Sequence, residues 1–171
     1  MIDYFVEPKS RKDLRALANS VRHCFGLDQE KRVPVVEMLD ILSLANENFN
    51  YEIVSDDALS ANIHAETDVR TGVIMIKETV YNRACNGEGR DRMTIAHELG
   101  HFFTLCCCGF KLYRNFYGRE VILFKQPEWQ AKCFAGEFMI PKHLVSDLTP
   151  EEIAKDCGVS LEAAQYQYKH W

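Results

Sequence analysis

The sequence lacks any uninterrupted apolar run close to the ~20 residues that a membrane-spanning helix needs. Its first residues, 1–7, carry two acidic side chains and are too weakly apolar for a secretory signal. Internal repeats and low-complexity tracts are missing as well. These absences argue against membrane, exported and repeat proteins. We therefore expect a cytoplasmic protein that has no membrane partner.

An excess of positive charge is also missing. The 20 Lys and Arg residues are scattered and are outnumbered by 25 Asp and Glu residues, which gives a formal net charge of −5. Because binding to phosphate groups needs clustered Lys and Arg, this charge argues against nucleic acid as a direct partner.

Cysteine, by contrast, is present seven times, and three of these residues are adjacent at positions 106–108. The number is odd and no export signal is found, so we expect reduced thiols. The triplet has two interpretations, a redox or metal-sensing switch and a helix end where small apolar thiols pack against the core. We favour the second, because thiol reactivity requires a lowered pKa that a sequence does not reveal.

The length of 171 residues and the hydrophobic fraction of 47% suit one ordinary domain with a real core. We divide the chain into a main domain, residues 1–145, and a small helical C-terminal segment, residues 146–171, packed on it. The sequence contains no indication of an oligomeric state.

Hydrophobic periodicity predicts an α+β fold. Helical spacing or helix start and stop signals mark residues 9–25, 34–45, 91–105, 127–140 and two short stretches within 149–171. Three short strands are predicted at residues 51–54, 61–64 and 72–77, most simply as a three-stranded antiparallel sheet. Residues 111–124 are ambiguous, and Tyr117-Gly118 could turn a hairpin there.

The segment His97-Glu98-Leu99-Gly100-His101 carries the strongest chemical signal. Residues four apart lie about 40° apart on one face of an α-helix, so His97 and His101 can present imidazole nitrogens to one zinc ion. Glu98 lies about 100° round from His97, where its carboxylate could take a proton from an attacking water. This pattern is typical of zinc peptidases.

A structural alternative is a pair of hydrogen-bonded histidines at the edge of the core. The residues around the motif make this helix too apolar for the surface: Ile95, Ala96, Leu99, Phe102 and Phe103. Two histidines and a glutamate in a largely buried helix need partners, and a metal ion would supply one.

A catalytic zinc site normally has three protein ligands. The longer motif with a third histidine fails here, since its positions hold Thr104 and Cys107. The next predicted helix offers Glu128 and Glu137, nine residues apart and therefore on opposite faces. Glu128 shares its face with four apolar residues: Ala131, Ala135, Phe138 and Met139.

We therefore expect Glu128 to point inward as the third ligand, and Glu137 to be solvated or to support the site from outside the ligand set. Two alternatives stay open. Glu128 could be a negative charge that the helix dipole favours near the helix N-terminus, and Cys107 could be the third ligand. Tyr113, Tyr117 and His143 could each stabilise a tetrahedral oxyanion, but no spacing argument selects one of them.

The most strand-like segment is Gly72–Lys77, just before the motif helix. We expect it to lie near the zinc with one backbone edge open to an extended substrate. The alternative is a central strand that is paired on both sides, because an apolar run also suits a buried position.

Three stretches of this chain resemble the ImmA/IrrE family of metallopeptidases. They are residues 92–102 (R-M-T-I-A-H-E-L-G-H-F), residues 128–141 (E-x-x-A-x-x-F-A-x-x-F-M-I-P) and residues 157–163 (C-G-V-S-L-E-A). The chain departs from many relatives at Leu105, where they have a histidine, and in its cysteine triplet.

The resemblance implies a small zincin-like fold with a helix-turn-helix-like C-terminal part. It implies zinc bound by His97, His101 and Glu128, with Glu98 as the general base. It also implies cleavage or inactivation of a cognate helix-turn-helix repressor, which would relieve repression in stress responses or mobile elements. We therefore interpret the chain as a zinc metallo-endopeptidase.

A second hypothesis is a non-enzymatic regulator that binds a repressor or DNA through residues 149–171. The last predicted helix carries one Lys and no Arg, which makes a poor phosphate-binding surface. The presence of Glu98 favours the enzyme, because pure binding needs no base beside a metal.

Overall fold

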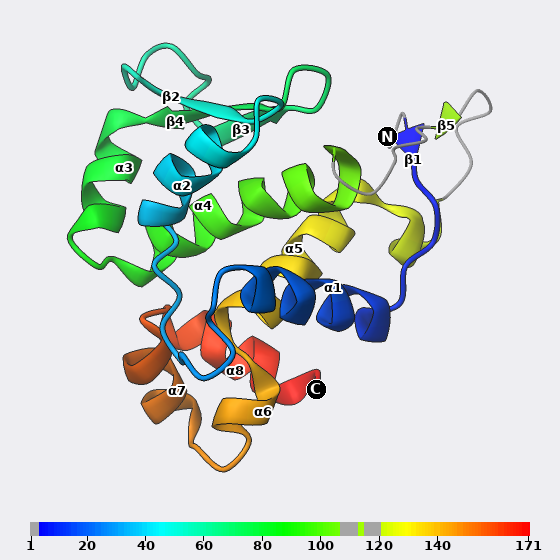
Figure 1. Cartoon of the computed structure of the whole chain (residues 1–171), viewed down its shortest axis with the longest axis vertical. Coiled ribbons are helices and arrows are strands. Elements are labelled where there is room, and N and C mark those ends of the chain that lie inside the picture. The colour runs from blue at the N-terminus through cyan, green and yellow to red at the C-terminus, as the bar shows by residue number, and fades with distance from the viewer. Residues whose placement is uncertain (1–3, 107–112, 115–120) are drawn as a thin grey trace.

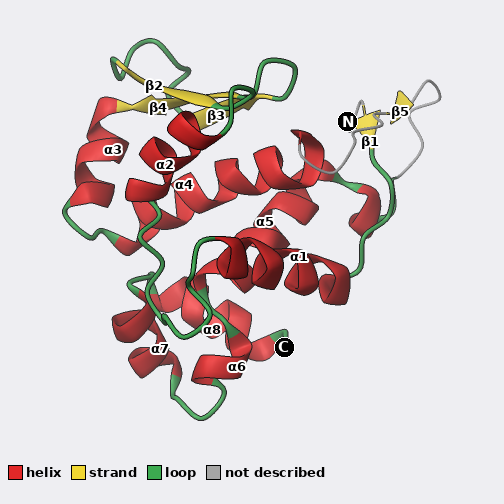
Figure 2. Ribbon diagram, viewed as in Figure 1, coloured by secondary structure: helices red, strands yellow, loops and turns green. Residues whose placement is uncertain are grey.

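The computed structural model describes residues 4–106, 113–114 and 121–171, and it has an α+β fold. A small sheet lies at one end of the molecule with α2, α3 and α4 beneath it, and α6, α7 and α8 gather at the other end (Figure 1). Helices α1 and α5 lie between these two groups, and Figure 2 shows how strongly helix predominates over strand. No helix within these ranges is both long and apolar enough to cross a membrane.

The main sheet contains β2 (Asn50–Val54), β3 (Ala65–Asp68) and β4 (Val73–Lys77) in the order β2-β4-β3. β3 pairs with β4 in the antiparallel sense, but β2 runs parallel to β4. The expectation of a wholly antiparallel sheet is therefore wrong, because β4 separates two strands that are consecutive in the sequence. The strand expected at 61–64 also begins later, at Ala65.

β4 is the central strand, paired on both sides, so the expected open edge on Gly72–Lys77 is wrong. Ile74 and Ile76 are fully buried, which fits the alternative interpretation of this apolar run as a buried central strand. The strand with one unpaired edge beside the motif helix is β3 instead.

The helices follow the predicted segments closely, but three of the described helices were not predicted: α3 (Glu78–Cys85), directly after β4, and the short 3-10 helix η2 (Leu123–Lys125) and α6 (Lys142–Val145). Helix α4 (Gly89–His101) carries the motif and continues as a π-helix, η1 (Phe102–Cys106). The remaining helices are α1 (Arg11–Cys24), α2 (Glu37–Ala45), α5 (Pro127–Met139), α7 (Pro150–Cys157) and α8 (Leu161–Lys169).

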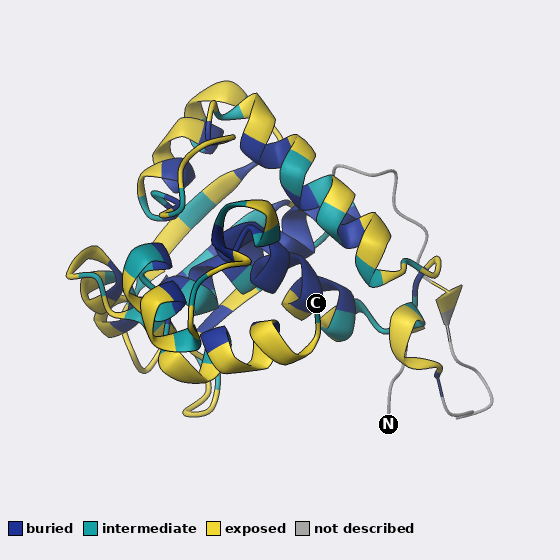
Figure 3. Cartoon of the chain, turned by 90° about the horizontal axis from the view of Figure 1, so that it is seen from below, coloured by how far each residue is buried: buried dark blue, intermediate teal, exposed yellow. Residues whose placement is uncertain are grey.

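Helix α5 packs against α4 on one side and α1 on the other, and nearly all its residues are buried from Gln130 onward. Figure 3 shows buried residues gathered where the helices meet, while the outward faces are exposed. Gly100 permits the close approach of α4 to α5, since a Cβ there would lie 2.7 Å from the carbonyl oxygen of Ala131. This contact sets the distance between the motif and the first turn of α5.

Glu137 faces α1 and is almost fully buried, so the expectation that it is solvated is wrong. Its carboxylate accepts hydrogen bonds from the guanidinium groups of Arg15, at 2.6 Å, and Arg11, at 3.0 Å. The ion pairs tie α5 to α1 on the side away from the motif. Glu137 therefore belongs to the helix packing and not to the group of ligands expected around the motif.

The C-terminal segment forms two short helices, α7 and α8, joined at Gly158, whose φ of 65° favours glycine. Arg92 of α4 holds this turn, because its Nε donates to the carbonyl of Gly158 at 2.9 Å. Ala164 of α8 is fully buried, whereas Tyr166 is 39% exposed and stacks on His170.

Several of the expectations concern residues 107–120. Cys107, Cys108 and Tyr117 lie outside the described residues, so the hairpin around Tyr117-Gly118 stays a prediction. Nearby, β5 (Tyr113–Arg114) pairs with β1 (Tyr4–Phe5), and residues 121–124 contain no strand.

The five cysteines in the described ranges form no disulfide. Cys106 is half-buried, and its thiol contacts the carbonyl oxygen of Val69 at 3.5 Å. Burial raises the pKa of this thiol. A raised pKa is the opposite of what a reactive thiol needs, so Cys106 fits the packing interpretation of the triplet.

Candidate metal centre

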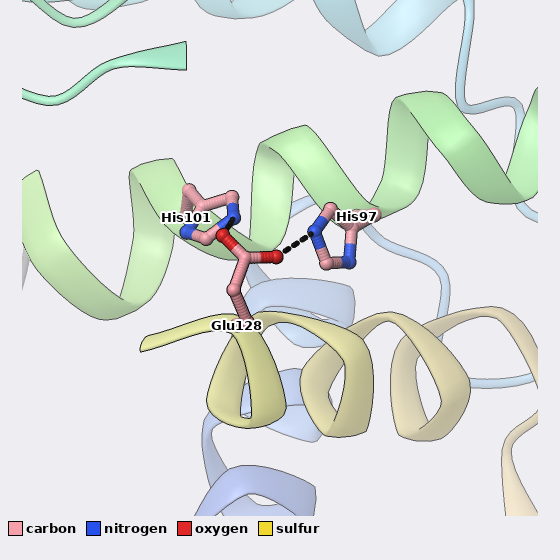
Figure 4. A group of neighbouring side chains, drawn as sticks. All are labelled: His97, His101 and Glu128. Atoms are coloured by element: carbon pink, nitrogen blue, oxygen red, sulfur yellow. Dashed lines mark hydrogen bonds and ion pairs between the residues drawn. The ribbon is translucent and has the colours of Figure 1, made fainter. Parts of the chain in front are cut away.

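His97 and His101 project from the same face of α4 toward the beginning of α5 (Figure 4). Their ring centroids are 4.8 Å apart and the ring planes are nearly perpendicular, at 88°. His101 is buried and His97 is half-buried, so both imidazoles stand at the boundary between the core and an open cavity. The helical spacing of the motif thus places both histidines on one face of α4, as the sequence predicts.

Glu128, in the first turn of α5, completes the group. Its Oε2 lies 3.2 Å from Nε2 of His97, and its Oε1 lies 3.2 Å from Nε2 of His101. The carboxylate therefore bridges the two imidazoles (Figure 4). Hydrogen bonds to His101 and His97 hold the pKa of Glu128 well below its ordinary value, so it is ionised at neutral pH.

Glu128 meets the histidines as expected, but the expectation that it is carried into the apolar interior is wrong. Its side chain is 75% exposed, while Glu137 is the buried carboxylate of this helix. The reason is that α5 is covered on both faces, so the apolar positions did not mark a single inward side. Glu128 lies at the end of the helix that emerges beside the motif.

The three side chains fit a metal ion. One ligand atom from each lies within 4.8 Å of the other two. Ligands at the zinc distances of ~2.0–2.2 Å in tetrahedral geometry are separated by roughly 3.3–3.5 Å, close to the two nitrogen–oxygen distances here. Two imidazoles and a carboxylate are also the donor set of a catalytic site with one open position. His97, His101 and Glu128 could therefore hold a metal ion.

Glu98 stands beside this group and outside it. It is 7% exposed, and its Oε2 accepts a hydrogen bond from the hydroxyl of Thr67 at 2.7 Å. Burial raises the pKa of Glu98, partly offset by the hydrogen bond from Thr67 and by the nearby histidines. A carboxylate with a raised pKa is suited to accept and return a proton.

These groups share a cavity of about 500 Å³. Its walls come from the segment leading into β3, from α4, from the start of α5 and from the N-terminal strand β1. The cavity is large enough for a few residues of an extended peptide and opens directly onto the histidines and Glu98.

Among the cavity residues that the sequence analysis did not predict are Thr67 and Tyr4. Neither belongs to a spaced motif. Tyr4 is brought to the site by the pairing of β1 with β5, and Thr67 by the packing of β3 against α4. A strand predicted at 65–68 would have included Thr67, but only the tertiary packing shows that its side chain faces Glu98.

Of the three residues considered as oxyanion stabilisers, neither described one reaches the cavity. His143 lies on α6 and contacts the backbone carbonyl of Asp28 at 3.3 Å. The hydroxyl of Tyr113 donates to Glu7. Tyr117 lies outside the described residues.

Comparisons with known proteins reveal a similarity of fold. No family model matches the chain, and no curated protein matches it. The fold is similar to that of a Mycobacterium tuberculosis transcriptional regulator, with a TM-score of 0.57 and 17% sequence identity over 90% of this chain. The match covers 45% of the regulator, so this chain corresponds to less than half of that protein. At this identity the similarity concerns the fold alone.

Proposed function

We propose that this chain is a zinc-dependent endopeptidase with a zincin-like fold, related to the ImmA/IrrE family. The observation that carries the proposal is the position of Glu128, whose two oxygens each lie 3.2 Å from an imidazole nitrogen of the HExxH helix. The motif alone supplies two donors, and α5 adds the third.

Zinc in this site would supply Lewis acidity, lowering the pKa of a water and polarising the scissile carbonyl. Glu98 is the proton acceptor: it takes a proton from the water as the water oxygen bonds to the carbonyl carbon. When the carbon–nitrogen bond breaks, Glu98 returns this proton to the amine nitrogen. Burial of Glu98 beside the cavity is consistent with this role.

The open edge of β3 is the proposed place for the substrate backbone. The amide of Lys77 donates to the carbonyl of His64 at 3.1 Å, so the backbone groups of His64 and Glu66 face β4. Because pairing alternates, those of Ala65 and Thr67 face away from it. Both residues line the cavity, and their backbone groups have no hydrogen-bond partner among the residues described.

We propose a cognate helix-turn-helix repressor as the substrate. The resemblance of the three sequence stretches supports this choice, and the fold similarity to a protein described as a transcriptional regulator is compatible with it. The same similarity motivates the second candidate, a non-enzymatic regulator that acts through α7 and α8. A base buried beside three metal donors favours the enzyme.

The first prediction separates ligands from base. His97→Ala, His101→Ala and Glu128→Ala should each lower bound zinc by about tenfold or more, whereas Glu98→Gln should keep zinc and lose proteolysis by about 10²-fold or more. Zinc is measured by elemental analysis of the dialysed protein. Proteolysis is followed by mass spectrometry, with helix-turn-helix repressors from the neighbouring genes as the candidate substrates.

Glu137→Gln is the matched control, since it alters another carboxylate of α5 that faces α1. It should keep zinc. If Glu128→Ala binds zinc as tightly as the parent protein, the ligand assignment fails. If the parent protein holds zinc but leaves the repressor intact, the substrate proposal fails.

The second prediction concerns the form of the substrate. Pairing with the β3 edge requires free backbone groups, which a helix does not offer. One cleavage-site sequence should therefore be cut at least about tenfold faster as a flexible linker than when locked in a stable helix. Equal rates for the two forms, measured by chromatography of the products, would contradict binding by strand addition.

A further inference from the structure

The hydroxyl of Thr67 hydrogen-bonds to the carboxylate of Glu98. Its Oγ1 donates to Oε2 of the Glu98 carboxylate at 2.7 Å and lies 3.3 Å from the backbone carbonyl oxygen of the same residue. The two residues are 31 positions apart in the sequence. Their contact joins the edge strand of the sheet to the motif helix.

Among the residues described, Thr67 is the one side chain that hydrogen-bonds to the Glu98 carboxylate. A glutamate has three rotatable bonds, and a base in a cavity must be held close to its productive position. With Oε2 occupied by Thr67, Oε1 is left for the proton transfer. The contact therefore selects one orientation of the carboxylate.

Thr67 is well suited to hold another group still. Its side chain is β-branched and stiff about χ1. Its backbone is fixed by the register of β3 on β4, where it stands opposite the fully buried Ile74. The support for Glu98 thus comes from the sheet and is independent of α5.

We propose that Thr67 is a positioning residue for Glu98, an inference that rests on the proposed endopeptidase function. The backbone of Thr67 also lies on the open edge of β3. A peptide paired with that edge would hold the residue that orients the base, so that substrate binding and alignment of Glu98 are coupled through Thr67.

The first experiment compares Thr67→Val, which keeps the shape and removes the hydroxyl, with Thr67→Ser, which keeps the hydroxyl. Thr67→Val should lower kcat by about 10- to 100-fold, with KM and bound zinc within about twofold of the parent protein. Thr67→Ser should restore most of kcat. Thr71→Val, in the exposed turn after β3, is the matched control and should leave all three quantities unchanged.

The second experiment needs no activity. The unfolding midpoint in urea is measured for the parent protein, Thr67→Val, Glu98→Ala and the double variant. If the hydroxyl holds the carboxylate, Thr67→Val lowers the midpoint in the parent protein and has a clearly smaller effect when Glu98 is already alanine. If Thr67→Val lowers the midpoint equally with and without Glu98, the Thr67 hydroxyl does not hold the Glu98 carboxylate and the proposal is overturned.

The outcomes separate this inference from the proposed function. Coupled midpoints together with a parent protein that cleaves nothing would leave the Thr67–Glu98 contact standing and reject the peptidase. Cleavage by the parent protein with an unchanged kcat in Thr67→Val would reject the positioning role and leave the peptidase standing.

Discussion

At the scale of single residues, the site contains two carboxylates whose surroundings differ sharply. Glu98 is buried, and desolvation raises its pKa. Glu128 is mostly exposed and is hydrogen-bonded to two imidazoles, which lower its pKa. Environments that separate the pKa values of neighbouring acids are a usual way to assign one of them to proton transfer. Here Glu98 has the character of a base that can return a proton, and Glu128 that of a permanent anion suited to a cation.

The burial of Glu98 predicts a cost in stability. Its pKa in the folded protein is raised, so its contribution to stability is fully present below the pKa of the unfolded chain and is lost as the pH rises through the folded pKa. In the metal-free protein, Glu98→Gln should therefore raise the unfolding midpoint at pH 7. The difference should shrink toward about pH 4, near the ordinary pKa of Glu.

The measurement is urea unfolding in the presence of a chelator at a series of pH values. Glu47→Gln, at an exposed position on the loop before β2, is the control and should show no such pH dependence. A parent protein that is more stable than Glu98→Gln at pH 7 would contradict the desolvation argument.

At the scale of elements, the metal site depends on how closely α4 approaches α5. Gly100 lies against the backbone of Ala131, and Glu128 lies one turn before Ala131 on the same helix. The contact involves backbone atoms, which cannot move aside as a flexible side chain can. A change at Gly100 should therefore move Glu128 relative to the histidines.

Gly100→Ala tests this dependence. Its Cβ would lie 2.7 Å from the carbonyl oxygen of Ala131, so the helices must separate. We expect a loss of about 1–3 kcal/mol in the free energy of unfolding, as for other overpacked cores. Bound zinc should fall by about tenfold. Calorimetry and elemental analysis measure the two effects.

Gly136→Ala is the matched control, a helical glycine in α5 whose added Cβ would meet the side chain of Gln167. It should retain zinc whatever its effect on stability. Zinc binding by Gly100→Ala equal to that of the parent protein would show that the approach of the helices does not set the ligand geometry.

At the scale of the whole molecule, the sheet, α4 and α5 build the cavity, while α7 and α8 lie at the far end (Figure 1). The surface of these last two helices is acidic. Glu151, Glu152, Asp156 and Glu162 outnumber Lys155 and Lys169. Such a surface repels phosphate groups, so α7 and α8 lack the positive charge that DNA binding through them would need.

The purified protein should accordingly show no sequence-specific DNA binding. We expect no salt-dependent change in the fluorescence anisotropy of a labelled promoter fragment around 0.15 M salt, because few Lys or Arg are available to displace counterions. A helix-turn-helix repressor whose operator lies on the same fragment is the positive control. Specific binding by this chain alone would favour the non-enzymatic regulator.

The features that the sequence determined by itself are those that depend on local geometry. Four-residue spacing on a helix brings His97 and His101 to one face and leaves Glu98 beside them, whatever the rest of the chain does. The start of α5 at Pro127 and its end before Pro141 follow from the same local rules, because proline fits the first turn of a helix and cannot continue one.

Only the tertiary structure decided which carboxylate of α5 is buried, which strand is central and what holds the base. Glu137 is buried because Arg11 and Arg15 come from α1, more than 100 residues away in the sequence. β4 is central because β2 pairs with one of its edges in the parallel sense and β3 pairs with the other. Thr67 reaches Glu98 because β3 packs against α4. Contacts between distant segments depend on how whole elements pack, and periodicity within one element contains no information about its neighbours.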